Sequence, residues 1–446
     1  MLRILSLFFL TAFLSSVSAQ EDVLTNYIKY GLENNLSMKQ KEFSLQKSLA
    51  ELSEARGYFF PSIGINARYT RAGGGRTFDI PIGDLMNPVY QALNIPIRLQ
   101  NEQINFFREK EQETKISLVQ PIFQPAIYYN YKIKSNLSDI QEFEKEIFTR
   151  TLISEIKSAY YNYLKTLQLE KLLSDTKLLL QENLRVSQSL FDNDKVTKDV
   201  VYRAETELRG LEQQITEAEN SKKLAQSYFN FLLNKPLEES IIIMEAENDF
   251  SEVYNIEDLE NSALRNREEL QQLGLAVETA DNTAGLSRSN FFPGISLAVD
   301  YGFQGEQYRF KDEDDFWMAS VVLQWNLFNG FRDNAKIEQA EMQKNEYQTK
   351  YDEVVNRIKL EVRQALYDFQ VVKKSIITAG QRLKSALKTF EIVNKKYSEG
   401  IASQIEFIDA RTTKTQAEIN MIITKYDYQI KLALLEKAVG SDEITN

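Results

Sequence analysis

The six residues Tyr-Phe-Phe-Pro-Ser-Ile at positions 58–63 recur as Asn-Phe-Phe-Pro-Gly-Ile at positions 290–295, in the second half of the chain. After each proline the sequence alternates between apolar and polar residues, which is typical of a β-strand with one apolar face. Because proline disfavours the α conformation in the residue before it, each motif predicts the end of a helix and the start of a strand. The chain is therefore expected to be an internal duplication.

A second pair of matching segments fixes the extent of the two copies. Leu118–Phe123 matches Leu323–Phe328, and the interval from Pro61 to Phe123 is longer than that from Pro293 to Phe328. The extra residues of the first copy fall within 71–115, a segment containing three consecutive glycines and several prolines, which predicts a long loop. The sequence thus predicts a first repeat at 20–234, an equatorial linker at 235–256, a second repeat at 257–440 and a C-terminal tail at 441–446.

Each repeat is expected to contribute two strands with one apolar face. Their length of about ten residues and the aromatic residues near their ends favour strands that cross a lipid bilayer. The alternative is the sheet of a soluble β-sandwich, whose strands alternate in the same way. The predicted strands are 62–71, 115–123, 294–303 and 317–327.

A very long helix and a returning helix follow the second strand of each repeat. After Pro125 and after Arg332 the chain runs for roughly 65 residues without a proline, enough for a helix on the order of 100 Å long. In the second copy, apolar residues from Ile358 to Tyr397 alternate spacings of four and three, which indicates a coiled coil. A returning helix with apolar residues at Ile401, Ile405 and Ile408 is expected to pack on it.

The fold class is therefore mainly α with membrane β: four long coiled-coil helices and four strands per chain. Four strands cannot close a barrel, and an open sheet edge in lipid would leave backbone groups without hydrogen-bond partners. Two or more chains must then complete one barrel. Two chains would give a barrel filled by side chains, whereas three would give twelve strands and room for a channel.

Composition excludes several classes of protein. The 446 residues include no histidine and no cysteine, and the net charge is −11, which disfavours zinc sites, thiol chemistry and nucleic-acid binding. We expect no catalytic residues, no cofactor and no metal site, and an enzyme using carboxylates alone, such as a glycosidase, is disfavoured. Residues 1–19, with Arg3, an apolar core and a small-residue cleavage site, predict a secretory signal peptide.

Taken in order, these motifs resemble the TolC family of outer-membrane efflux and export ducts. The resemblance rests on the two Phe-Phe-Pro motifs, the strand exits at 120–123 and 325–330, and the turn at Tyr397–Ile401. The segment Pro81–Tyr90 is similar to that of Bacteroidota members.

The resemblance implies a homotrimer in outer-membrane lipid, with a twelve-stranded β-barrel on a twelve-helix periplasmic tunnel. It also implies a passive exit duct for small molecules or proteins. Such ducts bind a periplasmic adaptor protein and serve an inner-membrane pump of the RND, ABC or MFS type, or a type I secretion system. A soluble periplasmic coiled-coil scaffold remains the alternative.

The resemblance also assigns two groups of site residues around the helical turns near 191–198 and 397–403. An acidic pair, Glu406 and Asp409, is implied to surround the periplasmic aperture, where carboxylates from several chains would attract cations and raise one another's proton affinity. The first turn departs from the family pattern, because Asp194 replaces a glycine and Val200 stands opposite Glu406. The implied adaptor-docking residues are Phe191, Asp194, Thr197, Tyr397, Gly400 and Ser403.

Overall fold

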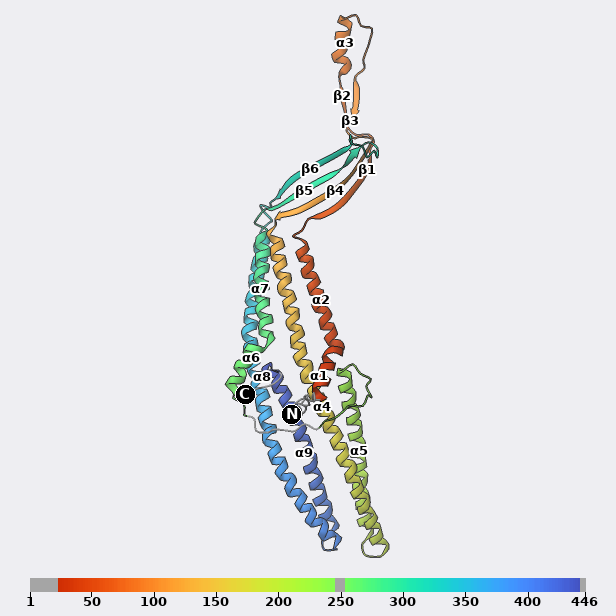
Figure 1. The fold of residues 1–446 in the computed structure, drawn as a ribbon, viewed down its shortest axis with the longest axis vertical. Helices are drawn as coiled ribbons and strands as arrows, with labels where there is room; N and C mark the ends of the chain where they lie inside the picture. The colour runs from red at the N-terminus through yellow and green to blue at the C-terminus, as the bar shows by residue number, and fades with distance from the viewer. Residues whose placement is uncertain (1–22, 245–252, 442–446) are drawn as a thin grey trace, which may run out of the picture. The chain divides into compact units, whose positions relative to one another are not determined.

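The computed structural model describes residues 23–244 and 253–441, so the predicted signal peptide and most of the predicted tail lie outside the described residues. The elements follow one another in the order shown in Figure 1. The first repeat comprises α1 (Val23–Asn34), α2 (Leu36–Gly57), β1 (Ser62–Arg71), β2 (Thr77–Ile80), α3 (Ile82–Ala92), β3 (Glu102–Asn105), β4 (Lys110–Phe123), α4 (Pro125–Asp192) and α5 (Lys198–Leu232). The second comprises α6 (Ile256–Asn266), α7 (Glu268–Ser289), β5 (Gly294–Gly305), β6 (Asp315–Gln324), α8 (Arg332–Ser398) and α9 (Gln404–Val439).

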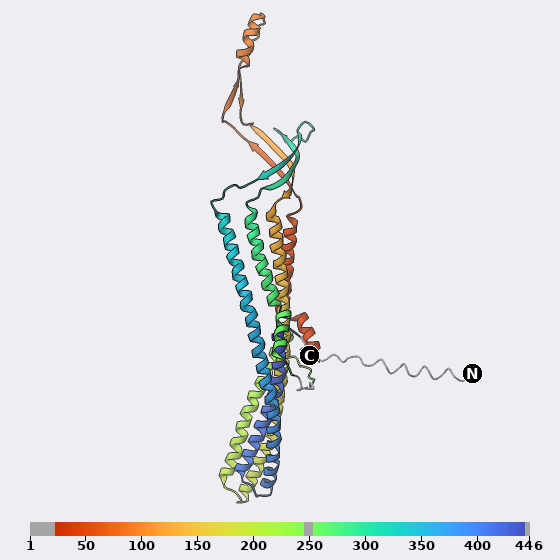
Figure 2. The same cartoon turned by 90° about the vertical axis from the view of Figure 1, so that its left-hand side faces the viewer.

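The duplication expected from the sequence is confirmed by these boundaries. The end of α7 follows the end of α2 by the same number of residues by which the start of β5 follows the start of β1. The two long hairpins, α4–α5 and α8–α9, correspond in the same way: α4 ends and α5 begins at positions equivalent to the end of α8 and the beginning of α9. Figures 1 and 2 show both hairpins running together in the helical part of the chain.

The chain divides into two compact units, which are described separately. One unit contains 1–47, 138–276 and 346–446, and the other contains 48–137 and 277–345. The second unit holds a four-stranded antiparallel sheet in the order β1-β4-β5-β6. β1 and β6 are its edges, and within the described residues no further strand pairs with either.

The sheet has one charged and one apolar face, as the alternation predicts. On the charged face Lys115 Nζ lies 2.8 Å from Asp300 Oδ2, and Arg68 lies 3.2 Å from Glu113. On the apolar face the side chains are bare: Ile65 is 74 %, Trp317 76 % and Val321 72 % exposed. A sheet with bare apolar residues and two open edges is an incomplete structure.

Four strand ends differ from the sequence prediction: the start of β4, the end of β5 and both ends of β6. β6 ends at Gln324, so the expected strand 317–327 extends too far. The reason is that Gln324 pairs with Gly294, directly after Pro293, and β5 offers no partner beyond it. β4 begins at Lys110 rather than at 115, because its first residues continue the ladder with β1 up to Arg71.

The segment 71–115 was expected to be a loop, and this expectation is wrong. It contains the hairpin β2–β3, the helix α3 and the first residues of β4. The regular structure of this segment depends on hydrogen bonds between residues far apart in sequence, which are described below. Sequence periodicity cannot reveal such bonds.

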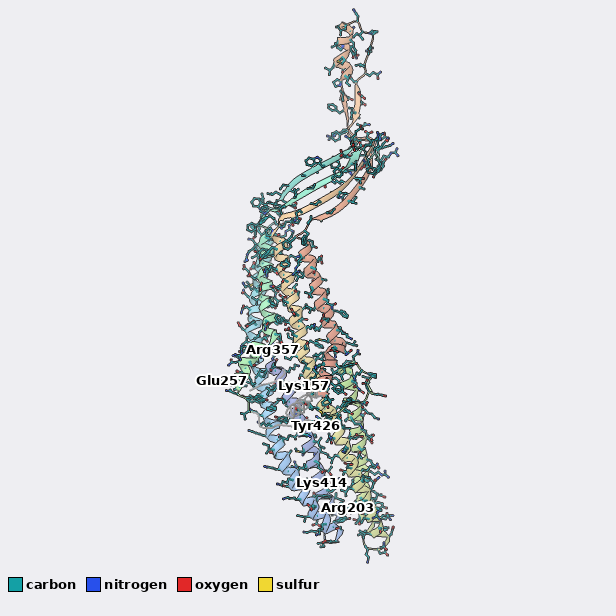
Figure 3. All side chains as sticks on the ribbon, in the orientation of Figure 1. Lys157, Arg203, Glu257, Arg357, Lys414 and Tyr426 are labelled. Atoms are coloured by element: carbon teal, nitrogen blue, oxygen red, sulfur yellow. The ribbon has the colours of Figure 1, made fainter. Side chains whose placement is uncertain are left out.

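The helical unit has two main apolar cores. One joins α1, α4 and α5 and contains the fully buried Ile156, Phe229 and Leu233. The other joins α6, α8 and α9 and contains Val362 and Tyr428. Ion pairs flank these cores, as between Lys157 on α4 and Glu436 on α9 at 2.7 Å; Figure 3 labels Lys157.

The coiled-coil prediction for α8 is confirmed, whereas the predicted stripe on α9 is wrong at its start. Every predicted apolar position from Ile358 to Tyr397 is buried or half-buried. On α9, however, Ile401 and Ile405 before and after the helix start are 69 % and 60 % exposed. The side chains that pack inward there are Gln404, Phe407 and Arg411, because polar partners on the first hairpin receive Gln404 and Arg411.

A network of charged side chains ties α4, α7 and α8 together near the break between α6 and α7. Arg150 contacts Glu268 and lies 2.8 Å from Glu269, which also binds Arg267 at 2.7 Å; Arg267 in turn reaches Glu361. Burial alone raises the pKa of Glu269, but the hydrogen bond and charge of Arg267, aided by Arg150, outweigh burial and lower it to about 2.

Among the described residues, no helix carries an apolar stretch long enough to cross a lipid bilayer.

Candidate functional site at the hairpin turns

The turns of the two long hairpins have the same backbone hydrogen bonds. In the first, Asp194 N donates to Phe191 O at 2.9 Å and Lys195 N donates to Leu190 O at 2.8 Å. The second repeats this pattern, with Gly400 N donating to Tyr397 O at 3.0 Å and Ile401 N to Lys396 O at 2.8 Å. These bonds satisfy carbonyl groups that a helix end otherwise leaves unpaired.

Both turns need one residue in the left-handed region, and the two copies supply it differently. Gly400 has a φ of 75°, whereas Asp194 at the equivalent place has a φ of 53°. A glycine adopts this conformation without steric cost, and aspartate tolerates it better than most residues. Asp194 at this position therefore leaves the turn intact.

The start of the returning helix differs more. Ser403 caps α9 in a reciprocal arrangement: its backbone N donates to Glu406 Oε2 at 2.7 Å, and its hydroxyl accepts from Glu406 N at 3.3 Å. Thr197 precedes α5 in an extended conformation but makes no such cap, and its hydroxyl contacts Asp199 instead. The first repeat cannot form the reciprocal cap, because Val200 stands where the second has Glu406.

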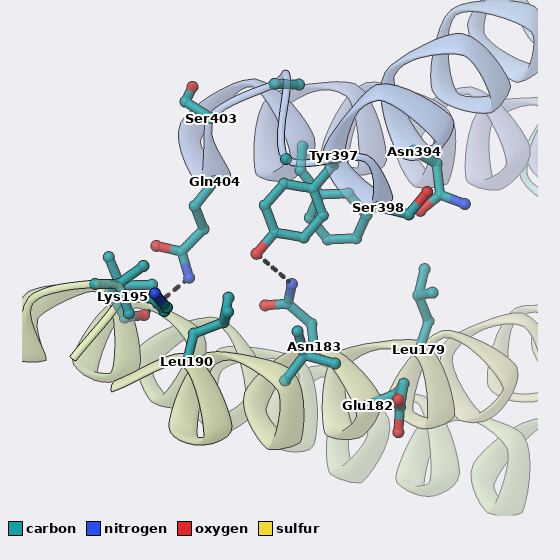
Figure 4. Close-up of a pocket in the computed structure, with 16 residues that line it drawn as sticks. Leu179, Glu182, Asn183, Leu190, Lys195, Asn394, Tyr397, Ser398, Ser403 and Gln404 are labelled. Carbon is teal, nitrogen blue, oxygen red and sulfur yellow. Dashed lines mark hydrogen bonds between the residues drawn. The ribbon is translucent and has the colours of Figure 1, made fainter. Parts of the chain in front are cut away.

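The two hairpins enclose a cavity of about 620 Å³ next to their turns. Figure 4 shows Tyr397 projecting into it; its hydroxyl accepts a hydrogen bond from Asn183 at 3.5 Å, and its ring stacks on Phe407 with centroids 4.6 Å apart. Gln404 Nε2 donates to Val200 O at 2.8 Å across the same space. The remainder is lined by apolar side chains, among them Leu179, Val186 and Leu190, and by polar ones that include Glu182, Lys195 and Asn394.

Three of the six predicted docking residues line this cavity: Tyr397, Gly400 and Ser403. The other three do not line it: Phe191 is half-buried, and Asp194 and Thr197 are exposed on the first turn. Sequence reasoning did not find Asn183, Gln404 or Phe407. Phe407 lies three residues after Gln404 and therefore on the same face of α9. This face was not predicted, because the apolar residues Ile405 and Ile408 indicated a different one.

The predicted aperture pair lies in the first two turns of α9, beginning with the residue that completes the cap at Ser403. Glu406 and Asp409 are both on α9, three residues apart, and Glu406 is exposed. Asp409 lines a separate cavity of about 520 Å³ between α5 and α9, together with Arg203 and Glu207. The backbone and hydroxyl hydrogen bonds of Ser403 lower the pKa of Glu406. This lowering of the pKa in a single chain is opposite to the raised pKa that is expected when carboxylates from several chains form a ring.

The first repeat holds this part of α9 through an ion pair. Arg411 is buried and contacts Glu207 on α5. Removal of a buried charge from its partner is costly, so this pair fixes how α9 is turned and therefore which side of it presents Asp409.

This combination of duplicated helical hairpins and strands with a bare apolar face is similar to that of outer-membrane efflux proteins. The family described as Outer membrane efflux protein matches residues 259–441. Outer membrane protein TolC of Escherichia coli (strain K12) is 21 % identical over 451 residues, covering 96 % of this chain and 84 % of that protein.

Solved structures share the fold over nearly the whole chain. A membrane protein from Pseudomonas aeruginosa aligns with a TM-score of 0.79 at 16 % identity, covering 94 % of each chain. The Campylobacter jejuni CmeC outer membrane channel aligns with a TM-score of 0.77 at 17 % identity, covering 94 % of this chain and 86 % of that one. These matches support the resemblance seen in the sequence: the chain is similar to outer-membrane efflux proteins of the TolC family over nearly its whole length.

Proposed function

We propose that three copies of this chain form a passive exit duct in the outer membrane, with a helical tunnel in the periplasm. The observation that carries the proposal is the incomplete sheet, with open edges at β1 and β6 and a bare apolar face. Pairing β1 of one copy with β6 of the next satisfies the backbone groups of both edges, and lipid covers the apolar face. Three copies supply twelve strands, and the charged face then lines the lumen.

Within this assembly the duct performs no chemistry, and its energy comes from a partner. We propose that the cavity between the hairpin turns, with Tyr397, Gly400 and Ser403, receives a periplasmic adaptor protein that connects the duct to an inner-membrane pump. The cavity has room for one or a few side chains from the tip of an amphipathic helical hairpin, and its lining offers them both apolar and polar groups.

We further propose that Asp409, with Glu406, lies at the narrow periplasmic entrance of the trimer. Three copies would bring six carboxylates together, which favours the passage of cations over anions. The pairing of Arg411 with Glu207 supports this role, since it holds the adjacent face of α9 against the first hairpin.

The experiment that tests the duct is native mass spectrometry of the protein purified from outer membranes in detergent, with electron microscopy of the same particles. The expected particle is a trimer with threefold symmetry and a hollow stalk. A monomer that remains dissolved without detergent would overturn the duct and favour a periplasmic coiled-coil scaffold.

A further inference from the structure

An arm of the chain, residues 72–109, leaves the sheet between β1 and β4. Its base is closed where Ala72 N donates to Glu109 O at 3.1 Å, directly beyond the last pair of the ladder, Arg71 with Lys110. Within the arm β2 and β3 pair antiparallel, and α3 follows β2. The arm thus continues the edge strand of the sheet.

One side of α3 is fixed against the extended segment that follows it. The Asn87 side chain accepts from Leu99 N at 2.7 Å and donates to Leu99 O at 2.8 Å. Asp84 and Asn101 are joined twice: Asp84 N donates to Asn101 Oδ1 at 3.0 Å, and Asn101 Nδ2 donates to Asp84 Oδ2 at 2.8 Å. Gly83 permits this closeness, since a Cβ there would lie 2.5 Å from Leu99 O.

The opposite side of α3 is apolar and bare. Leu85, Val89 and Leu93 follow one another at intervals of four residues, which places them in one stripe, and their exposures are 67 %, 47 % and 63 %. Asp84 is the one charged residue between 81 and 97, and its carboxylate already binds Asn101. We call the stripe Leu85–Val89–Leu93 the arm face. A rigid apolar stripe of this kind indicates a docking surface.

We propose that the arm faces of the copies in one assembly dock on one another. This inference rests on the proposed trimer. Because the arm continues β1, an edge strand, every copy that extends the sheet delivers one arm to the same rim of the barrel. Identical surfaces that carry no charge meet without repulsion, which suits contact between copies.

The size of the arm face agrees with contact between tethered copies rather than free ones. Three side chains bury far less than the roughly 1,200 Å² of a small stable interface, so free chains would not associate through them. Arms fixed to one rim, however, are present at effective concentrations on the order of millimolar, at which a small apolar contact forms. The arms then close together beyond the strands, across the outer exit.

Cysteine cross-linking tests this inference directly, because the chain has no cysteine of its own. Val89→Cys places a thiol in the arm face, and Gln91→Cys places one on the exposed far side of the same helix, about 200° away. In detergent-purified trimers treated with copper phenanthroline, we expect about tenfold more covalent dimer from Val89→Cys than from Gln91→Cys. Dilution should leave this yield unchanged, because the contact forms within one particle.

A charge placed in the arm face provides the second measurement. Val89→Lys brings like charges together and should reduce cross-linking through Leu93→Cys about tenfold, whereas Gln91→Lys should not. Native mass spectrometry of every variant separates the two proposals: an intact trimer without Val89→Cys dimers overturns the docking of the arms and leaves the duct standing. A monomer overturns both. Protection of Val89→Cys from maleimide on lipid vesicles alone, without dimers, would assign the arm face to the membrane and overturn the inference.

Discussion

Arg267 occupies in the second repeat the position that Asn35 occupies in the first, and each residue separates two helices. The interval between them in sequence is the one that also relates the two Phe-Phe-Pro motifs. Asn35 accepts from Met38 N at 3.0 Å and donates to Leu232 O at 2.8 Å, so it starts α2 and holds the end of α5. Arg267 reaches Glu269 and Glu361 and so connects α7 to α8. One break is thus stabilised by an amide and the other by charge.

The charged break predicts a dependence of stability on pH. The pKa of Glu269 in the folded chain, about 2, lies below its ordinary value of 4.5, so its ionisation stabilises the fold above pH 4.5. That contribution, on the order of 3 kcal/mol, is lost as the pH falls through the range between these two values. Glu269→Gln should therefore lower the denaturation midpoint at pH 7 and flatten the loss of stability in that range. An unchanged pH profile for Glu269→Gln would contradict the network.

Asn35→Ala should destabilise the first repeat at every pH. The substitution removes two hydrogen bonds and leaves the buried Leu232 carbonyl without its partner, which costs about 1–3 kcal/mol. Chemical denaturation at pH 4 and pH 7 measures the effect. Asn34→Ala is the matched control, because the side chain of this adjacent residue donates to Tyr30 O within its own exposed turn. Equal losses for both variants would contradict the role of Asn35.

Two glycines of α7 predict opposite effects of the same substitution. A Cβ at Gly285 would lie 2.3 Å from the ring of Tyr129, so Gly285→Ala should displace α4 from α7 and lower stability. At Gly274 nothing lies within 4 Å, so Gly274→Ala should raise stability by about 0.5–1 kcal/mol through helix propensity. Thermal unfolding of the two variants should therefore shift in opposite directions, and shifts of the same sign would contradict the contact.

The turn of the second hairpin allows its shape and its docking to be tested separately. Gly400→Ala places a side chain at a φ of 75° and should cost about 1 kcal/mol, whereas Asp194→Gly should be neutral or stabilising. Gly400→Arg should in addition abolish export in cells while the trimer remains assembled. The measurement is drug resistance at matched expression; full resistance in the Gly400→Arg cells would argue against adaptor docking here.

The proposed aperture is tested by removing charge without removing the helix cap. Glu406→Gln retains an oxygen that can accept from Ser403, and Asp409→Asn leaves the cap untouched. In planar bilayers the double variant should show lower selectivity for cations and weaker block by multivalent cations. Glu399→Gln is a control from the turn outside the pair. Unaltered selectivity in the double variant would place both carboxylates outside the entrance.

The sequence predicted the long helices and the strands because each depends on a local period. The stripe from Ile358 to Tyr397 is continuous, and the strand after Pro61 alternates without a break. The prediction failed where the burial of a residue depends on a partner that is distant in the sequence. On α9, Gln404 and Arg411 are buried because they bind polar partners on α5, the carbonyl oxygen of Val200 and the carboxylate of Glu207. A pattern of apolar residues cannot indicate such contacts.

The arm shows the same limit. Its glycines and prolines indicated a loop, yet the side chains of Asn87 and Asn101 hold a helix against an extended segment twelve to seventeen residues away. For the site, the turns could be located from Gly400 and its counterpart Asp194. The cavity between them could not, because it forms only where Asn183 of one hairpin meets Tyr397 of the other.

The reciprocal cap between Ser403 and Glu406 has no counterpart at Thr197, so the two hairpin ends of one chain open with unequal ease. The first turn of α9 should exchange its amide hydrogens more slowly than that of α5, since it must break two extra hydrogen bonds to unwind. A partner that contacts both hairpin ends therefore meets a helix start at α9 that unwinds less readily and one at α5 that unwinds more readily. The fit to such a partner can adjust at the α5 start alone.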